Sequence, residues 1–308
     1  MRAAVFAYHE IGYVCLEEVL ASGMEVACLF THKDDPDEEI WFRRPVDLAL
    51  EHAIPVYDPE RLRDGKWTDL LKGVAPDFIF SFYYRYMIPQ DILDCARLAA
   101  LNLHGSLLPK FRGRCPVNWV LIKGEKKTGV TLHVMEVKPD AGDIVAQREV
   151  DITFEDTAHS LFLKLASAAR TLMKEILPQL LSGEVPRAPQ TGASSYFGGR
   201  RPEDGLVDWS ANAHTVYNLI RAVTHPYPGA FTFVDEKKLF IWKAEPMDIP
   251  SAVPAGTVIS LRPFVVAASQ GALRLVSVQL EGEPESTAEE FVDTHKLKLE
   301  GKHLGGTL

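Results

Sequence analysis

The first half of the chain alternates strand-like and helix-like segments, and this alternation restricts the folds open to it. Apolar runs rich in strand-forming residues occupy residues 2–8, 24–32, 54–58 and 76–84. Between them lie segments with helical spacing of their apolar residues, at 11–23, 41–53 and 60–73. This order predicts one open, mainly parallel sheet with helices on both faces, a Rossmann-like α/β fold.

The sheet is expected to end near residue 152. The segment ARLAALNLHGS leads through one more strand into a polar loop that contains Gly and Pro. Residues 128–152 read as two further strands that flank the loop KPDAGD. A long amphipathic helix is predicted over 157–183, with a glycine just past its end.

The second half has a different character. Residues 185–205 are rich in Pro, Gly and Ser, which indicates a linker. A helix is expected over 211–224, and five short alternating runs follow it, which predict a small β-barrel of the OB type or a sandwich. We therefore expect a first domain over 1–184, a linker over 185–204 and a C-terminal domain over 205–308.

Composition excludes several classes of protein. The chain has 33 Lys and Arg against 42 Asp and Glu, and a net charge of −9 disfavours a nucleic-acid partner, whose binding depends on neutralised phosphates. No apolar run reaches the roughly 18 residues of a membrane span. The four cysteines lack CxxC spacing, which predicts reduced thiols in a cytoplasmic protein. The first turn, AYHEIG, lacks the GxGxxG fingerprint, so no bound NAD is expected.

The segment LNLHGSLLPKFRGRCPVNW, residues 101–119, carries the strongest chemical signal. Asn102 and His104 stand two residues apart at the end of a predicted strand, so both side chains point to the same face. An isolated Asn-x-His pair is more often structural, because histidine frequently serves only to hold neighbouring groups. The surrounding residues change that interpretation.

The surrounding pattern resembles the folate-dependent formyltransferase family. After Asn102 and His104 come SLLP at 106–109, then Gly113, Pro116 and Trp119, and later Asp140 in the sequence DAGD. These elements stand in the family's order, and the resemblance extends over nearly the whole chain. It implies the formyltransferase fold, with 10-formyltetrahydrofolate as the co-substrate.

The resemblance also implies a role for each residue. Asn102 would stabilise the oxyanion of a tetrahedral intermediate, His104 would transfer protons, and Asp140 would hold the imidazole and raise its pKa. No metal is required, and His104 and His133 lack companions with ligand-like spacing. The positions that match the family's folate pocket are Tyr86, Met87, Ile88, Arg114, Glu136, Val137, Lys138, Pro139 and Asp140. Met87 and Ile88 could equally pack in the core, with only their backbone lining the pocket.

Three branches of the family differ in the amine they formylate. The glycinamide ribonucleotide enzymes have essentially one domain, so residues 205–308 argue against that branch. The methionyl-tRNA enzymes need a basic surface, but residues 205–308 carry 9 Lys and Arg against 12 Asp and Glu. The loop after the second strand is also acidic, with Asp34, Asp35, Asp37, Glu38 and Glu39.

The closer match is the bacterial branch that formylates UDP-4-amino-4-deoxy-L-arabinose. Supporting segments are SFYYRYMIP, SSYFGGRRPEDGLVDW and NLIRAVTHPYPGAF. We expect the sugar nucleotide near Arg200 and Arg201, with Asn118 as another candidate, although paired arginines in a linker are also typical of a solvated surface. A methionyl-tRNA substrate or another amino-sugar nucleotide remains the alternative.

The same branch carries a C-terminal decarboxylase/dehydrogenase domain. This chain stops at GGTL without a second dinucleotide-binding pattern, so we expect either an excised domain or a single-activity relative. The longer enzyme would be oligomeric and this segment monomeric. Two other functions are weaker: a catalytically silent folate- or nucleotide-binding module, and a hydrolase that passes the formyl group to water.

Overall fold

The computed structural model describes residues 1–34, 40–250, 253–299 and 302–305. The chain divides into two compact units. The first comprises residues 1–116, 127–152 and 162–197, and the second comprises 117–126, 153–161 and 198–308. The domain limits expected from the sequence stay a prediction, and so does the acidic loop, since Asp35, Asp37, Glu38 and Glu39 lie outside the described residues.

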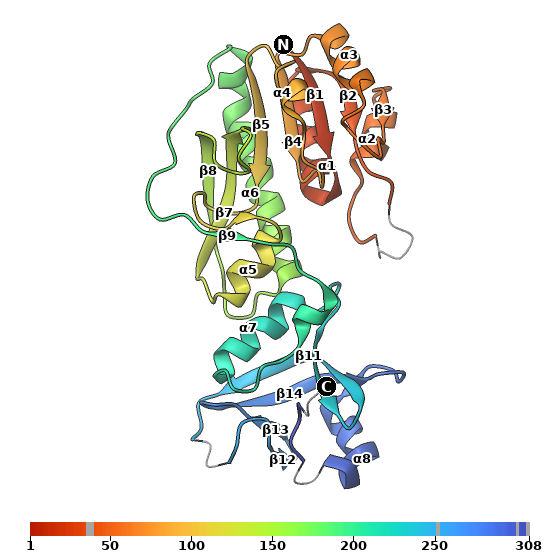
Figure 1. Cartoon of the computed structure of the whole chain (residues 1–308), viewed down its shortest axis with the longest axis vertical. Coiled ribbons are helices and arrows are strands. Elements are labelled where there is room, and N and C mark those ends of the chain that lie inside the picture. Colours follow the sequence, from red (N-terminus) through yellow and green to blue (C-terminus); the bar gives the residue numbers. More distant parts are fainter. Residues whose placement is uncertain (35–39, 251–252, 300–301, 306–308) are drawn as a thin grey trace. The chain divides into compact units, whose positions relative to one another are not determined.

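The first unit is built on a seven-stranded sheet with the order β3-β2-β1-β4-β5-β7-β8 (Figure 1). Its strands are β1 (Arg2–Ala7), β2 (Glu25–Phe30), β3 (Val56–Tyr57), β4 (Phe78–Phe82), β5 (Ala99–His104), β7 (Lys127–Val134) and β8 (Ile144–Asp151). The first five pair in parallel, whereas β7 runs antiparallel to β5 and to β8. The predicted mainly parallel sheet is confirmed.

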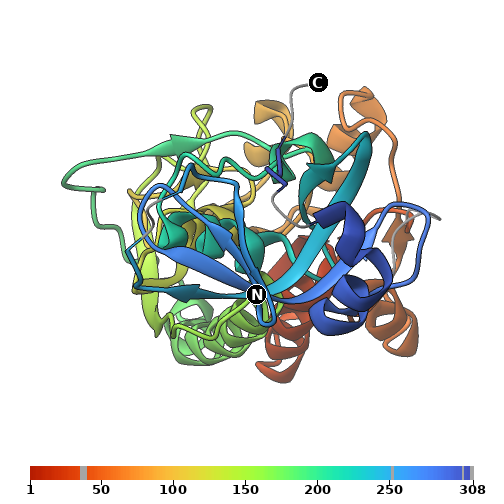
Figure 2. The ribbon, with the colours of Figure 1, turned by 90° about the horizontal axis from the view of Figure 1, so that it is seen from below.

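Helices cover both faces of this sheet, as Figure 2 shows. They are α1 (His9–Ala21), α2 (Pro45–Glu51), α3 (Gly65–Val74), α4 (Gln90–Leu93) and α6 (Ala158–Leu181). Arg170 on α6 forms ion pairs with Glu17 and Glu18 on α1, which places these two helices side by side. Helices α3 and α4 pack together on the opposite face.

The central strands are buried on both faces, which explains their continuous apolar runs. On the α3–α4 face, Phe6 and Phe30 stack with ring centroids 4.4 Å apart, and Leu71 and Ile92 belong to the same buried cluster. Fixed in this way, β4 and β5 end at one edge of the sheet. The loops that start at Tyr83 and Gly105 leave from that edge, where ligands of open α/β sheets usually bind.

The segment before the second unit follows the first unit closely. Ala188 exchanges two backbone hydrogen bonds with Ile144, at 2.8 and 2.9 Å. Further on, β9 (Tyr196–Phe197) pairs with β6 (Arg112–Gly113). Strand β6 lies in the segment that follows β5, residues 105–115, which we call the signature loop. Residues 188–197, predicted as linker, therefore contact the start of β8 and the signature loop.

The second unit contains an antiparallel sheet with the order β10-β11-β14-β13-β12, and β15 pairs with β14. Its strands are β10 (Ala230–Val234), β11 (Lys237–Met247), β12 (Val258–Leu261), β13 (Phe264–Ala267), β14 (Ala272–Leu280) and β15 (Ser286–Thr287). Its helical elements are α5 (Pro116–Ile122), η1 (Pro202–Gly205), α7 (Ala213–Val223) and α8 (Ala288–Leu299). The sequence predicted a small β-barrel of the OB type or a sandwich here, and the structure confirms a β-rich C-terminal domain with an antiparallel sheet. No helix in the described part of the chain has an apolar stretch sufficient for a bilayer span.

Candidate active site

Strand β5 presents both Asn102 and His104 at the carboxyl edge of the sheet. The antiparallel register with β7 sets Asn102 opposite His133 and His104 opposite Thr131. Residues opposite each other across two strands have their side chains on the same face. The register therefore adds a second imidazole, that of His133, to the pair predicted from the sequence.

His133 holds the amide of Asn102. Its Nδ1 lies 2.8 Å from the carbonyl oxygen of Val134, which can only accept, so Nδ1 carries a proton. Its Nε2 lies 3.1 Å from Nδ2 of Asn102 and 3.5 Å from Oδ1 of Asp140. When Nε2 is unprotonated it accepts a hydrogen bond from the Asn102 amide, whose second N–H is then left for a ligand.

His104 is buried, with 7% of its surface exposed. Its Nε2 donates to the carbonyl oxygen of Phe111 at 2.7 Å, so Nδ1 is the nitrogen that gains and loses a proton. Nδ1 lies 3.6 Å from Oδ1 of Asp140. Burial lowers the pKa of His104, and it prevails over the opposing effects of Asp140 and the Phe111 carbonyl.

Asp140 lies in the loop between β7 and β8, with its backbone in the left-handed region at φ 54°. Its Oδ2 accepts a hydrogen bond of 2.8 Å from the backbone N–H of Gly113. Burial on its own would raise the pKa of Asp140, but the interactions with His133, His104 and Gly113 outweigh it and lower the pKa to about 2. Asp140 is therefore a carboxylate throughout the neutral range.

Two glycines of the family pattern, Gly113 and Gly142, allow the backbone to pack closely around the site. Gly113 has φ 96°, and a Cβ there would lie 2.2 Å from the carbonyl oxygen of Phe197. A Cβ on Gly142 would lie 2.1 Å from the carbonyl oxygen of Val134. Any side chain at either position would displace backbone that carries the site.

Polar side chains of β7 and β8 hold the SLLP loop. The hydroxyl of Thr131 donates to the carbonyl oxygen of Ser106 at 2.6 Å and accepts from the N–H of Leu108 at 3.2 Å. Gln147 donates to the carbonyl oxygen of Leu108 at 2.8 Å and to the Thr131 hydroxyl at 2.9 Å. The loop after His104 is thus fixed to the sheet.

The residues matched to the folate pocket lie in two loops and in the signature loop. Ile88 is buried in the same apolar cluster against which Met135 packs, whereas Tyr86 and Met87 are 51% and 64% exposed. In the second loop Glu136, Val137 and Lys138 are exposed, and Pro139 is half-buried. Arg114 is exposed, and its backbone N–H donates to Phe197.

The three candidate substrate residues belong to the second unit. Asn118 is 7% exposed and its Nδ2 donates to the carbonyl oxygen of Ala222 at 2.7 Å, so a substrate contact by this amide would break a buried bond. The guanidinium of Arg200 lies over the ring of Trp119, 5.0 Å from its centroid. Arg201 is exposed, and its backbone N–H donates to Asp204.

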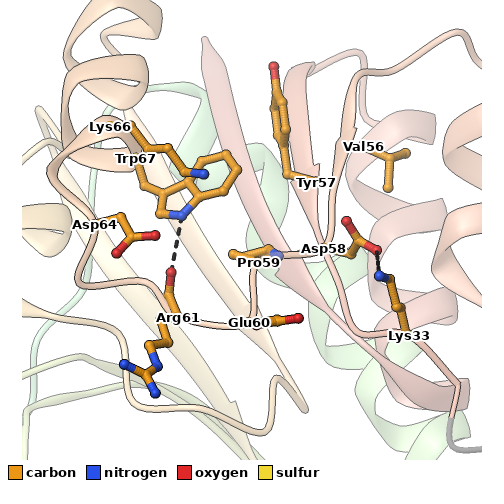
Figure 3. Close-up of a pocket in the computed structure, with 10 residues that line it drawn as sticks. All are labelled: Lys33, Val56, Tyr57, Asp58, Pro59, Glu60, Arg61, Asp64, Lys66 and Trp67. Atoms are coloured by element: carbon orange, nitrogen blue, oxygen red, sulfur yellow. Dashed lines mark hydrogen bonds and ion pairs between the residues drawn. The ribbon is translucent and has the colours of Figure 1, made fainter.

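A separate pocket lies at the carboxyl end of β3 (Figure 3). Its volume is about 390 Å³, and the rings of Tyr57 and Trp67 form an apolar part, with centroids 5.4 Å apart. The charged residues that line it are Lys33, Arg61 and Lys66 with Asp58, Glu60 and Asp64. These opposite charges balance, so the pocket favours neither an anion nor a cation, and no residue of the predicted site lines it.

The described residues contain no group of three or more His, Cys, Asp or Glu side chains arranged to hold a metal ion. His104 and His133 direct one ring nitrogen each to a backbone carbonyl and the other toward Asp140. The geometry suits proton transfer between polar side chains, with an amide donor beside them.

The titration of His104 tests this geometry without any substrate. We expect its imidazole to titrate below the ordinary pKa of about 6.5, since burial disfavours the charged form. Asp140→Asn should lower this pKa further, because it removes the carboxylate that favours the imidazolium. NMR titration of the histidine ring signals measures both. A His104 that titrates above 6.5, or that does not respond to Asp140→Asn, would contradict the arrangement.

The cluster brings an imidazole, a carboxylate and an amide donor together at the edge of an α/β sheet. Residues 2–177 match the family model described as formyl transferase, and residues 200–296 match the formyl transferase C-terminal domain. The chain belongs to the formyl transferase family. The resemblance noted in the sequence is confirmed at this level.

Solved structures share the fold at low sequence identity. An N-formyltransferase from Helicobacter canadensis, in complex with folinic acid and dTDP-3-aminofucose, aligns with a TM-score of 0.69 at 19% identity over 89% of this chain and 98% of its own. A 4-N formyltransferase from Francisella tularensis gives 0.63 at 18% identity, over 79% and 96%.

HypX from Aquifex aeolicus, in complex with tetrahydrofolic acid, has a TM-score of 0.63 at 20% identity over 95% of this chain. The match covers 47% of HypX, so this chain spans about half the length of that protein.

Proposed function

We propose that the chain transfers a formyl group from 10-formyltetrahydrofolate to the 4-amine of UDP-4-amino-4-deoxy-L-arabinose in the cytoplasm. The observation that carries the proposal is that His104 contacts Asp140 directly and Asn102 is linked to Asp140 through His133, in a member of the formyl transferase family. The Helicobacter canadensis N-formyltransferase, solved with dTDP-3-aminofucose, supports an amino-sugar nucleotide as the acceptor.

Formyl transfer needs a neutral amine and a donor for the oxyanion that forms when the amine attacks the formyl carbon. Asn102 supplies the donor through the N–H that His133 leaves unused. Because His133 fixes the amide before reaction, the donor does not reorient as the charge develops. Such a donor typically lowers the barrier by about 3 kcal/mol.

His104 transfers the proton at Nδ1, because Nε2 is committed to the Phe111 carbonyl. In its neutral form it accepts a proton from the attacking amine, and Asp140 stabilises the imidazolium that results. The imidazolium then returns the proton to the leaving nitrogen. Asp140 remains ionised, consistent with its lowered pKa.

Apolar side chains exposed on the loops at 86–88 and 136–140 would suit a flat heteroaromatic co-substrate. Tyr86 and Met87 expose apolar surface on one loop, and Val137, which is 79% exposed, does so on the other. Ile88 and Met135 anchor the two loops in a single apolar cluster. We infer that the pterin lies against the backbone of residues 86–88 and 136–140, with Arg114 as the contact for anionic groups.

For the sugar nucleotide we infer contacts of Arg200 and Arg201 with the diphosphate. Cationic guanidinium groups suit paired phosphates, which they can bind with two hydrogen bonds each. The ring of Trp119 already orients Arg200, which reduces the entropy lost on binding. We assign Asn118 no contact with the sugar nucleotide, because its side chain connects α5 to α7.

Another amino-sugar nucleotide is the main alternative, favoured by the dTDP-3-aminofucose complex of the Helicobacter canadensis enzyme. The 9 Lys and Arg against 12 Asp and Glu in residues 205–308 disfavour methionyl-tRNA. The discriminating assay offers 10-formyltetrahydrofolate with UDP-4-amino-4-deoxy-L-arabinose, dTDP-3-aminofucose and methionyl-tRNA in parallel.

We expect turnover with the UDP-sugar at a kcat/KM at least about tenfold above that for the dTDP-sugar, and none with the tRNA. Turnover of the tRNA alone would show that the charge argument misjudged the partner. Binding of folate without turnover of any amine would support the silent binding module. Release of formate without an acceptor would support a hydrolase.

A further inference from the structure

Gln190 lies in the segment that the sequence predicts as a linker, yet its side chain is enclosed in a hydrogen-bond network. Its Nε2 donates to the carbonyl oxygens of Asp140 and Gly142, at 2.9 and 2.8 Å. Its Oε1 accepts from Nε and Nη2 of Arg112, at 3.2 and 2.7 Å. Both N–H groups of the amide and both lone pairs of its oxygen are therefore used.

The partners of Gln190 belong to the two loops that carry the site. Asp140 and Gly142 lie in the β7–β8 loop, and Arg112 immediately precedes Gly113, whose N–H binds the Asp140 carboxylate. The two connections form a closed ring. The Asp140 side chain binds the signature loop directly at Gly113. Its backbone carbonyl binds Gln190, which in turn binds Arg112 of the same loop.

Asp140 depends on such support because its backbone is strained. A φ of 54° lies in the left-handed region, which is uncommon for a residue with a side chain. This conformation directs Oδ1 toward His104 and His133 while Oδ2 meets Gly113. Relaxation of the backbone would withdraw the carboxylate from both imidazoles.

The segment that carries Gln190 is held on both sides. Before it, Ala188 pairs with Ile144 through two backbone hydrogen bonds. After it, the hydroxyl of Ser195 accepts from the N–H of Phe111 at 2.9 Å, and β9 pairs with β6. Gln190 is thus presented to the two loops from a fixed backbone.

From this geometry we infer that Gln190 is a positioning residue: it holds Asp140 at the distance from His104 that formyl transfer requires. The inference rests on the proposed function for its kinetic consequence. Its structural part, the orientation of Asp140 toward His104, stands apart from any substrate. The hydrogen bonds of the Gln190 side chain reach Asp140, Gly142 and Arg112. Gln190 therefore acts on His104 through Asp140.

The test compares Gln190→Ala, Gln190→Met and Gln190→Glu with the parent protein and with Gln270→Ala, an exposed glutamine of the second unit. Met keeps the length of the side chain without its polar atoms. Glu keeps the acceptor for Arg112 but removes both donors to the Asp140 loop. Kinetics with 10-formyltetrahydrofolate and the accepted amine, and the NMR titration of His104, are measured for each.

All three variants are expected to lower kcat roughly tenfold to a hundredfold, the range for a displaced catalytic group, with KM for both substrates within about threefold. In Gln190→Ala and Gln190→Met the pKa of His104 should move down toward its value in Asp140→Asn. Gln270→Ala should match the parent in both measurements. Gln190→Glu keeps the contact with Arg112. If its kcat is as low as that of Gln190→Ala, the loss is due to the missing N–H donors to Asp140 and Gly142.

Three results would overturn the inference: kcat within twofold of the parent in folded Gln190→Met, full rescue by Gln190→Glu, or a His104 titration that does not change. If Gln190→Ala fails to fold, Gln190→Met and Gln190→Glu still decide. If the parent turns over no amine, the proposed function fails. The titration of His104 then tests the role of Gln190 by itself.

Discussion

His104→Ala is expected to lower kcat by about 10³-fold or more, within the range that general acid–base catalysis contributes. The affinity for tetrahydrofolate should stay within about twofold, because the loops matched to the folate pocket are held by other contacts. Ile88 is anchored in the apolar cluster of α3 and α4, and Gly142 is packed against the backbone of Val134. Rapid-quench kinetics together with folate titration by calorimetry separate the two quantities.

The same substitution should leave a folded protein. The carbonyl oxygen of Phe111 then keeps only the 3.3 Å contact with the hydroxyl of Ser106, whose single proton also reaches the carbonyl oxygen of Lys110 at 2.7 Å. The weakened acceptor is expected to cost about 1 to 3 kcal/mol, less than the roughly 5 to 15 kcal/mol that stabilise a typical domain. His104→Gln, which fills more of the space, serves as the matched control and should be as slow as His104→Ala. Near-normal kcat in either variant would show that another group transfers the proton.

Strand β5 is a case in which the local pattern was sufficient. Alternation along LNLH predicted one face for Asn102 and His104, and β5 places them so. Strands β1, β2 and β4 were equally legible, because a strand buried on both faces is a continuous apolar run. The register then added what the pattern lacks: His133 is opposite Asn102, though 31 residues away along the chain.

Two helices carried local signals that other features obscured. Helix α5 begins at Pro116, a residue favoured in the first helical turn, but it follows a polar loop rich in Gly. Helix α8 begins with a capping box, in which Thr287 and Glu290 exchange hydrogen bonds of 3.0 and 3.2 Å. Its apolar face is short, so periodicity does not reveal it.

The segment at 188–197 could not be predicted from composition. Pro, Gly and Ser are typical of linkers because they disfavour helices and strands, yet they also occur in extended chain that is held by its neighbours. The contacts of Gln190 with Arg112 and Asp140 span 78 and 50 residues. Only the folded sheet brings these positions together, so a linker signal says nothing about what the linker touches.

Asn102→Ala is expected to lower kcat by about 10²- to 10³-fold, as for the removal of one oxyanion donor. KM for the amine and for 10-formyltetrahydrofolate should change little, because the oxyanion exists only on the way to product. Steady-state kinetics with both substrates varied measures this. A rise in KM at constant kcat would contradict the role, since it would mean that Asn102 binds substrate and transition state equally.

His133 supplies the control for this role. His133→Phe keeps the ring and removes the nitrogen that orients the Asn102 amide, so kcat should fall by about tenfold, less than when the donor itself is lost. Because His133 is expected to act through Asn102, the double variant should be no slower than Asn102→Ala. Losses that multiply would instead show that the two residues act independently. In that case the second contact of His133, its Nε2 lying 3.5 Å from Oδ1 of Asp140, would explain the loss of kcat in His133→Phe.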